Sequence, residues 1–340
     1  MNVLSLFDGM SCGQIALNRA GFKIDSYFAC EIDKHAIKVT QSNYPDTIQL
    51  GDVTKVDSLM LPRIDLIMGG SPCQGFSFAG KQLNFNDPRS ALFFEFVRLL
   101  GEVRAENPNV KFLLENVKMK KEYQDVISHY LGVQPIQINS ALVSAQNRVR
   151  LYWTNLEGVE QPRDLGLLLN DVLNDGSFSR RGKSLCLTQG YQKLTSRDYH
   201  EKSKGQQVQG LNSGAIRGRY INKATIVGRR LDENGTRKDY DKTVPITQCL
   251  EVRATNLGKS NCLTTVEKDN VLSDLPPGRY PGVYEKDIPY RKLTPVECER
   301  LQTVPDNYTA VVSNSQRFRM LGNGWTVDVI AHILKSDISL

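Results

Sequence analysis

The 340-residue chain is predicted to be an α/β protein with a doubly wound, mostly parallel sheet and a smaller β-rich part. Two features of the sequence carry this prediction. Short apolar runs alternate with helix-like segments over residues 1–160, which is the pattern of repeated βαβ units. Over residues 158–278 that pattern fades, and glycine, asparagine, serine and basic residues dominate. The two parts are therefore expected to differ in architecture.

Each expected strand is a short apolar run, and the expected helices are bounded by residues typical of helix ends, such as Gly21. The expected strands are residues 3–7, 26–30, 48–50, 64–68, 112–114, 134–138 and 150–154, with short β-like runs at 224–227 and 245–250. The expected helices are residues 14–20, 34–43 and 88–105. Later helices are expected to begin at Thr294 and Pro295 and, after a turn from Gln316, at Val327.

A cysteine follows the fourth expected strand. The run RIDLIMGGSPCQGFS, residues 63–77, opens as a buried strand, breaks at Gly69 and Gly70, and presents Cys73 behind a proline. Functional groups of open α/β sheets lie at the carboxyl ends of strands, where this cysteine would be. Free cysteine is often a core residue, but the neighbours here are glycine, proline and glutamine. We therefore expect Cys73 to be a nucleophile.

The first three strand ends suit a nucleoside ligand. The turn at residues 8–13 contains glycines that let the backbone approach a ligand. Glu31 could bind ribose hydroxyls, and Asp52 could accept a hydrogen bond from an adenine amino group. Either acid could instead cap a helix or form a turn. NAD is the competing ligand, but the turn lacks the G-x-G-x-x-G spacing for a pyrophosphate, which S-adenosylmethionine (AdoMet) does not need.

A carboxylate and two arginines are the remaining candidate functional side chains within residues 1–160. Glu115 follows the fifth expected strand, on the sheet edge of Cys73, although an exposed strand-end acid would look the same. Arg148 and Arg150 alternate along the last strand, so they are expected on one face. Paired arginines occur on ordinary exposed edges, but beside these groups they suit a base carbonyl and a phosphate.

The positive charge is concentrated in the middle of the chain. Residues 176–259 contain 17 Lys and Arg against 7 Asp and Glu, a balance of +10, so the remainder carries −4 within the net charge of +6. A basic module suits a polyanion such as nucleic acid, although basic solvated loops are common. Arg229, Arg230 and Arg253 are candidates to contact bases; phosphate contact or plain solvation are the alternatives.

The composition and the first residues of the chain restrict the cellular compartment in which the protein is expected. No apolar run approaches the roughly 20 residues that span a bilayer, so no membrane partner is expected. The start MNVLSLFDG lacks a basic n-region and a cleavage site, so no signal peptide is expected. The seven cysteines form no C-x-x-C pair, which argues against a metal site and for reduced thiols in a cytoplasmic compartment.

These motifs, in this order, resemble those of the cytosine-C5 DNA methyltransferases. SLFDGMSCG resembles the family's first AdoMet motif, in a form also seen in animal de novo DNA methyltransferases, GGSPCQGFS its Pro-Cys motif, and ENV its catalytic glutamate. Gln146, Arg148 and Arg150 match Gln-x-Arg-x-Arg, and SNCLTTVEKDNV resembles the Thr-Leu segment of the target-recognition domain. Residues 290–308 resemble the family's ninth motif, and residues 316–334 resemble its tenth. In the tenth motif of the family, a final helix packs against the first strand. Here Gly324 and Trp325 stand where many bacterial members have Ser-Val.

The resemblance implies the Rossmann-like fold of AdoMet-dependent methyltransferases, with an AdoMet-binding and catalytic domain at 1–160, a β-rich target-recognition domain at 161–285 and a C-terminal return at 286–340. Asn323 and Gly324 are expected at the N-terminus of the final helix. The implied catalytic residues are Cys73, Glu115, Arg148 and Arg150. The implied AdoMet contacts are Phe7, Asp8, Gly9, Met10, Ser11, Cys12, Gly13, Glu31, Ile32, Asp52, Val53, Ser71, Pro72, Asn323, Gly324 and Trp325. The implied DNA contacts are Gln74, Ser77, Arg229, Arg230, Arg253, Thr264 and Thr265.

The implied reaction transfers a methyl group from AdoMet to C5 of a cytosine flipped out of double-stranded DNA, through an adduct of Cys73. Such a protein would be cytoplasmic and nucleoid-associated in a prokaryotic or phage-infected cell, and a cognate restriction endonuclease is a conceivable partner. The alternatives are a tRNA cytosine-C5 methyltransferase, although its typical Cys-Phe-Thr element is absent, and a catalytically silent DNA-binding relative. A zinc deaminase would need P-C-x-x-C, and Pro72-Cys73 lacks the second cysteine.

Overall fold

The computed structural model describes residues 1–71, 91–174, 222–232, 236–253, 271–273, 278–281 and 290–337. These residues form two compact units. The first contains residues 1–167 and 298–337, and the second contains the described residues from 168 to 297. No helix among these residues has the length and apolar character needed to cross a membrane.

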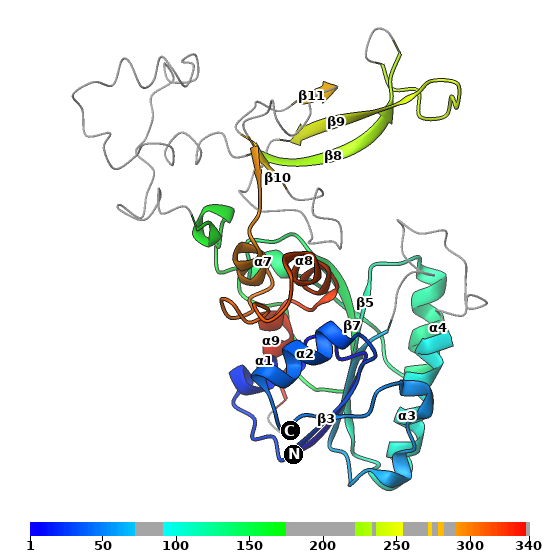
Figure 1. Ribbon diagram of the computed structural model, residues 1–340. Coiled ribbons are helices and arrows are strands. Elements are labelled where there is room, and N and C mark those ends of the chain that lie inside the picture. The colour runs from blue at the N-terminus through cyan, green and yellow to red at the C-terminus, as the bar shows by residue number, and fades with distance from the viewer. Residues whose placement is uncertain are drawn as a thin grey trace. The chain divides into compact units, whose positions relative to one another are not determined.

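A seven-stranded sheet forms the centre of the first unit, in the order β3-β2-β1-β4-β5-β7-β6 (Figure 1). All neighbouring strands from β3 to β5 are parallel, whereas β7 is antiparallel to both of its neighbours. This confirms the predicted doubly wound, mostly parallel sheet. The strands are β1 (Asn2–Leu6), β2 (Ser26–Cys30), β3 (Ile48–Gln49), β4 (Leu66–Gly70), β5 (Lys111–Val117), β6 (Ile136–Asn139) and β7 (Val149–Thr154).

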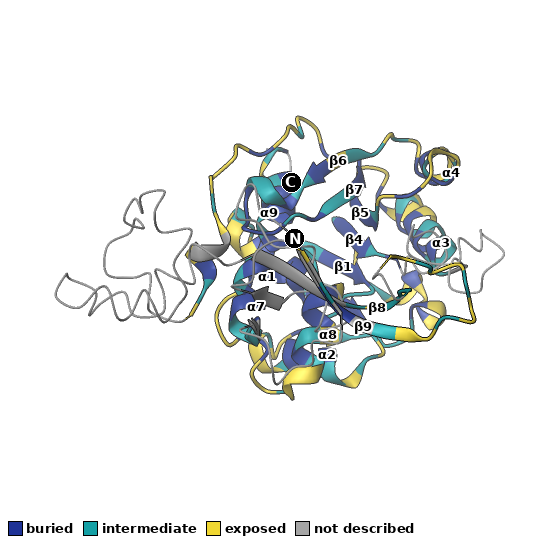
Figure 2. Cartoon of the chain, turned by 90° about the horizontal axis from the view of Figure 1, so that it is seen from above, coloured by how far each residue is buried: buried dark blue, intermediate teal, exposed yellow. Residues whose placement is uncertain are grey.

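Helices cover both faces of this sheet, as a buried parallel sheet requires (Figures 1 and 2). One face carries α3 (Ala91–Glu106) and α4 (Lys121–Leu131), and the other α1 (Cys12–Ala20), α2 (Lys34–Asn43) and α9 (Val327–Lys335). Phe93, Phe96 and Leu99 recur at helical spacing on α3 and are fully buried in the core beneath it. Short 3-10 turns, η1 (Val53–Lys55), η2 (Ser58–Met60) and η3 (Ser140–Leu142), connect these elements.

The final helix α9 packs beside α1, on the face of the sheet that α1 and α2 also cover (Figure 1). Helix α1 lies close against strands β2 and β4 at Gly13. A Cβ atom at Gly13 in α1 would lie 2.6 Å from Met68 Sδ and 2.7 Å from Tyr27 Oη, so only glycine allows this close approach.

Two strands differ from their predicted limits. Gly69 and Gly70 are the last two residues of β4, and the strand does not break before them, because Gly69 pairs with Leu6 and Gly70 with Glu115. Glu115 lies within β5 and not beyond its end, because antiparallel pairing with β7 continues to Val117. Side-chain patterns did not reveal these extensions, because they depend on which strand lies alongside.

Two helices were not predicted from the sequence. Helix α4 has a regular apolar spacing, with Tyr123, Ile127 and Leu131 buried, and that signal was available but not used. Helix α8 (Asn314–Asn323) replaces the turn expected from Gln316. Its buried residues include Arg317, Met320 and Leu321, and a buried arginine weakens the apolar pattern.

The second unit contains a five-stranded sheet in the order β11-β9-β8-β10-β12. All of its pairings are antiparallel, and the two β-like runs expected near residues 224 and 245 lie in β8 and β9. Its elements are η4 (Leu169–Val172), β8 (Asn222–Arg230), β9 (Ile246–Arg253), β10 (Val271–Ser273), β11 (Gly278–Pro281) and β12 (Tyr290–Lys292). Helix α7 (Pro295–Leu301) follows β12.

A buried ion pair joins α7 to α8. The Glu299 side chain is completely buried, and its Oε1 lies 2.9 Å from Arg317 Nη2. The same carboxylate accepts the backbone N–H of Asn307 at 2.7 Å and of Thr309 at 2.9 Å. A buried charge held by this many donors is stable only while all of its partners remain.

Replacing Glu299 should therefore lower the free energy of unfolding strongly. For Glu299→Ala we expect a loss of about 3–5 kcal/mol in urea unfolding, because Arg317 would be left buried without its counter-charge. The neighbouring Arg300→Ala is the matched control, since the exposed Arg300–Asp306 pair should contribute at most about 1 kcal/mol. Equal losses in the two variants would contradict this account.

Candidate active site

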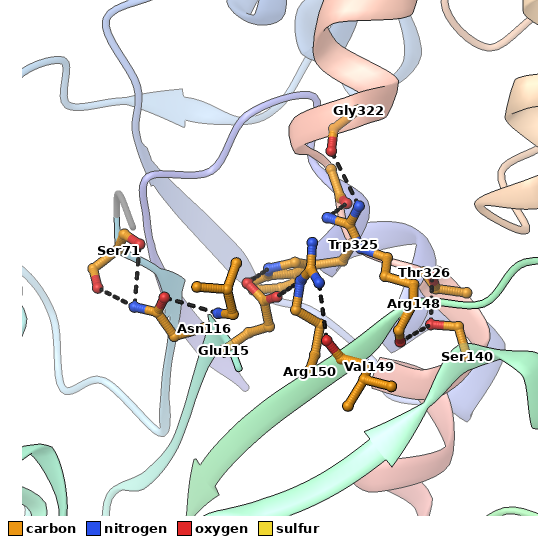
Figure 3. A network of polar contacts seen from close by, with 12 residues as sticks. Ser71, Glu115, Asn116, Ser140, Arg148, Val149, Arg150, Gly322, Trp325 and Thr326 are labelled. Atoms are coloured by element: carbon orange, nitrogen blue, oxygen red, sulfur yellow. Dashed lines mark hydrogen bonds and ion pairs between the residues drawn. The ribbon is translucent and has the colours of Figure 1, made fainter. Parts of the chain in front are cut away.

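A carboxylate held by an ion pair and a hydrogen bond lies at the carboxyl end of the central sheet. Glu115, on β5, is 8% exposed, and its Oε1 lies 2.9 Å from Arg150 Nε on the neighbouring strand β7. Its Oε2 accepts a hydrogen bond of 3.2 Å from the indole Nε1 of Trp325 (Figure 3). Residues from the middle and from the end of the chain thus fix both oxygens of one carboxylate.

The last glycine of β4 leaves room for this arrangement. A Cβ atom at Gly70 would lie 2.9 Å from Trp325 Nε1 and 3.1 Å from Glu115 Oε2. Any side chain there would displace the indole or the carboxylate. The glycine required by the site is therefore at the paired end of a strand, where glycine often marks close approach.

Ser71, the residue after β4, is held in place by the Asn116 side chain. The Asn116 side chain is 1% exposed, and its Nδ2 donates to the Ser71 hydroxyl at 3.1 Å and to the Ser71 carbonyl at 3.4 Å (Figure 3). The expected AdoMet contact Ser71 is thus 5% exposed and tied to the residue after Glu115. Asn116 was not predicted from the sequence as a site residue. Its position directly after Glu115 could have indicated this role.

The two arginines of the Gln-x-Arg-x-Arg segment bind different partners. Arg148 precedes β7 and is 3% exposed, and its guanidinium donates to the carbonyls of Gly322 at 3.1 Å and Gly324 at 2.9 Å (Figure 3). Gln146 is fully buried and donates to the Leu301 carbonyl at 2.9 Å. Gln146 and Arg148 therefore hold the C-terminal segment, while Arg150 faces Glu115.

The first loop is built around the carboxylate of Asp8. Asp8 accepts hydrogen bonds from Ser5 Oγ at 2.6 Å, from Tyr27 Oη at 2.8 Å and from the Ser11 hydroxyl. Burial raises the pKa of Asp8 to about 6, although these three hydroxyl donors lower it. Phe7 and Ser11 adopt positive φ angles of 58° and 59°, a strained backbone often found at functional loops.

Glu31 holds the same loop from the end of β2. Its Oε2 accepts the backbone N–H of Gly9 at 2.8 Å, and its Oε1 accepts those of Ile32 and Asp33, each at 2.8 Å. The turn-forming use of this acid is therefore present in the structure. Ile32 directly follows and is 78% exposed, which places an apolar side chain in the open beside the loop.

Asp52 caps η1 with one oxygen. Its Oδ1 accepts the Thr54 backbone N–H at 3.0 Å and the Thr54 hydroxyl at 2.9 Å, and these bonds hold the pKa of Asp52 below its ordinary value. The Val53 side chain is buried in the core. Arg98 of α3 fixes the turn by donating to the carbonyls of Val53 and Val56, each at 3.2 Å.

The first loop also contacts the segment before Trp325. Met10 and Cys12 are 1% and 3% exposed, and a Cβ atom at Gly324 would lie 3.0 Å from Met10 Cε and 3.4 Å from Cys12 Sγ. Burial raises the pKa of the Cys12 thiol to about 12, although a hydrogen bond from the Trp325 backbone lowers it. Cys12 is thus a buried thiol that is protonated at neutral pH.

Asn323 and Gly324 do not lie at the N-terminus of the final helix, as the sequence had suggested. Asn323 is the last residue of α8, Gly324 caps that helix, and Thr326 is the N-cap of α9. The unpredicted helix α8 is the reason, since it extends to the position where a turn was expected. Trp325 therefore stands in the short connection between the two helices.

In the second unit, two predicted DNA-contacting arginines have partners within the β8–β9 hairpin. Arg230 Nη1 donates to the Lys242 carbonyl at 3.2 Å and also to the Val244 carbonyl. Arg229 Nη1 lies 3.9 Å from Asp239 Oδ2. Arg253 is the last residue of β9. Pro72, Cys73, Gln74, Ser77, Thr264 and Thr265 lie outside the described residues.

The raised pKa of Asp8 predicts a pH-dependent contribution to stability. Its ordinary value of 3.8 is raised to about 6 in the folded protein, so the unfolded chain releases this proton first and stability falls as the pH rises from about 4 to about 6. We expect the difference in unfolding free energy between wild type and Asp8→Asn to become less favourable to wild type across this range. A constant difference in urea unfolding at pH 4, 5, 6 and 7 would contradict it.

Comparison with known proteins agrees with this geometry. The chain matches the C-5 cytosine-specific DNA methylase family over residues 1–129 and 142–338. It is 30% identical over 340 residues to the type II methyltransferase M1.ScrFI of Lactococcus lactis subsp. cremoris, covering 96% of this chain and 75% of that protein. It is 28% identical over 348 residues to the type II methyltransferase M.NlaX of Neisseria lactamica, covering 97% and 94%.

The fold also matches a solved structure. An E. coli protein encoded within a prophage, and described as a DNA modification methyltransferase, superposes with a TM-score of 0.60 at 23% identity, covering 99% of this chain and 98% of that one. The segments that match the family include strands β1 to β5 and β7, the first loop, Glu115, Arg150 and the C-terminal helices. The chain therefore belongs to the C-5 cytosine-specific DNA methylase family.

Proposed function

We propose that the chain is an AdoMet-dependent DNA (cytosine-5-)-methyltransferase that acts on a flipped cytosine through a covalent adduct of Cys73. The observation that carries this proposal is the Glu115 carboxylate, held by Arg150 and Trp325 beside the strand that leads through Ser71 to Pro72 and Cys73. A fixed carboxylate at this place is what the activation of a cytosine ring requires.

The proposed chemistry begins at C6 of the base, because C5 of cytosine is a poor nucleophile. The Cys73 thiolate adds to C6, and a proton held between the Glu115 carboxyl group and N3 moves toward N3, which neutralises the negative charge that develops as the new bond forms. Arg150 orients Glu115 and supports O2 of the base, while Arg148 holds the C-terminal segment that presents Trp325. AdoMet, when bound, supplies the methyl group that C5 accepts. Loss of the C5 proton to water then allows Cys73 to leave.

Several chain features suit AdoMet as the cofactor. Gly9 has a φ of 60° and lies where its backbone can approach a ligand closely. The exposed apolar side chain of Ile32 suits one face of an adenine ring. The bonds that Asp52 accepts from described residues go to Oδ1, so Oδ2 is available to an adenine amino group. Phe7, Met10, Ser71 and Trp325 would complete the surroundings of the ligand.

Double-stranded DNA is the proposed substrate, and the second unit is proposed to recognise the target sequence. Its β-sheet and the basic balance of residues 176–259 support this, as does the match to DNA methylases. The proposed setting is the cytoplasm of a prokaryotic or phage-infected cell. The type II names of the relatives support a cognate restriction endonuclease as a further partner.

The decisive assay offers AdoMet labelled in the methyl group to double-stranded DNA of mixed sequence and, in parallel, to bulk tRNA. We expect label in 5-methyldeoxycytidine after digestion to nucleosides. Label in tRNA alone would move the protein to the RNA branch. Label in neither, with DNA still bound, would contradict the proposed enzyme for the sequences tested and favour a silent relative.

Cys73→Ala should abolish methyl transfer while leaving DNA binding in gel-shift titrations, because the adduct at C6 could no longer form. Cys298→Ala is the matched control, since Cys298 is a buried thiol on α7 with no part in the proposed reaction. Turnover by Cys73→Ala near that of Cys298→Ala would rule out the covalent mechanism.

Asp52→Asn should weaken AdoMet binding about tenfold, a factor equivalent to about 1.4 kcal/mol, in calorimetry. The amide can keep the cap at Oδ1, but it presents N–H groups where an adenine amino group needs an acceptor. Asp57→Asn is the control, because Asp57 Oδ1 caps η2 in the same way by accepting the Leu59 N–H at 3.0 Å. An equal change in both variants would remove Asp52 from the AdoMet site.

A further inference from the structure

We propose that Trp325 is a positioning residue for Glu115, and that its indole N–H fixes the plane of the carboxylate for the reaction. This inference rests on the proposed function of Glu115. It adds a residue that acts through the carboxylate and not merely on the cofactor, and it gives a reason for tryptophan at this position.

An ion pair holds one oxygen of Glu115 and a hydrogen bond holds the other, and the two partners lie on different elements. Arg150 Nε lies 2.9 Å from Oε1, and Trp325 Nε1 lies 3.2 Å from Oε2. The Glu115 and Arg150 side chains are 10% and 14% exposed, so water contributes little to fixing this geometry. With the ion pair alone the carboxylate could rotate about its last torsion, which is soft. With an ion pair at one oxygen and a directional hydrogen bond at the other, its plane is fixed before the base arrives.

The Trp325 ring is itself confined by glycines. Gly70 gives the indole nitrogen its room, as a Cβ atom there would lie 2.9 Å from Nε1. On the other side, a Cβ atom at Gly13 of α1 would lie 3.7 Å from Cζ3 of the same ring. The indole thus spans from the first turn of α1 to the end of β4, between the first loop and Glu115.

The backbone of Trp325 is anchored as firmly as its ring. Its main chain bonds the buried thiol of Cys12, and the preceding carbonyl of Gly324 accepts hydrogen bonds from Arg148 at 2.9 Å and Gln302 Nε2 at 3.1 Å. The next residue, Thr326, is bonded by Ser140 at 2.9 Å (Figure 3). These bonds fix the main chain on both sides of the indole, so the ring keeps its N–H directed at Glu115.

The indole could instead serve only as apolar packing, in which case loss of the N–H alone would have no catalytic effect. Trp325→Phe separates these cases, because it keeps an aromatic ring and removes the donor. Trp153→Phe is the matched control: Trp153, the other tryptophan, is fully buried and also loses one indole bond, of 2.9 Å to Ser128 Oγ.

The readout is release of tritium from C5 of cytosine in duplex DNA to water. Addition of the Cys73 thiolate to C6 makes C5 accept a solvent proton, loss of the tritium to water follows, and departure of the thiolate restores the base. This exchange needs Glu115 and no methyl group. For Trp325→Phe we expect exchange and kcat to fall about tenfold, equivalent to about 1.4 kcal/mol, with the Kd for AdoMet within about twofold of wild type. Trp153→Phe should keep the exchange rate while lowering the urea midpoint.

A double-mutant cycle tests whether Trp325 acts through the carboxylate. In a Glu115→Gln background, adding Trp325→Phe should change the residual exchange by less than about twofold. If Trp325→Phe folds poorly, benzothienylalanine in a Trp153→Phe background replaces the ring N–H by sulfur in nearly the same shape. It should reproduce the same loss.

The possible failures are distinguishable. Normal exchange in Trp325→Phe with exchange abolished in Glu115→Gln would overturn this inference and leave the proposed function standing. Weakened AdoMet binding with normal exchange would also overturn it, because Trp325 would then act only on the cofactor. Normal exchange in Glu115→Gln would instead remove the proposed function of Glu115 itself.

Discussion

The pairing of one antiparallel strand with a parallel sheet is the constraint on which the site depends. Because β7 runs against β5, its ladder continues to Val117 after the parallel neighbour β4 has ended at Gly70. That extension keeps Glu115 within a paired, rigid strand and places Arg150 two positions away across the ladder, since Val117 pairs with Arg150 and Glu115 with Tyr152. A carboxylate on a free loop at this edge would not meet its partner with comparable geometry.

The C-terminal segment completes the site although it is the most distant part of the chain in sequence. Buried polar side chains, not apolar packing alone, hold it in place: Arg148 and Gln302 bind the carbonyls at the end of α8, and Tyr308 Oη donates to the Met10 carbonyl at 2.8 Å. Such bonds are directional, so they specify position where apolar contacts would allow sliding. The segment matching Gln-x-Arg-x-Arg thus serves the site partly by holding the backbone that presents Trp325.

Buried carboxylates in this protein differ according to what surrounds them. Glu299 is satisfied by an arginine and two backbone N–H groups, whereas Asp8 is satisfied by neutral hydroxyls, and burial raises the pKa of Asp8 to about 6. Hydroxyl dipoles compensate a buried charge less completely than a guanidinium does. The first loop is therefore built on a carboxyl group whose charge changes within an accessible pH range.

The sequence by itself determined the α/β class, the order of the strands along the chain and the candidates Cys73, Glu115 and Arg150, because apolar periodicity and strand-end polar residues are local signals. The tertiary structure decided the register that puts Glu115 inside β5, the helix α8 that moves Asn323 away from the start of α9, and the hydrogen bond from Trp325 to Glu115. These features depend on contacts between residues as much as 210 positions apart, and no local pattern encodes them. Local sequence patterns thus identify candidate residues of a site, and only the packing of distant segments determines which of their atoms come into contact.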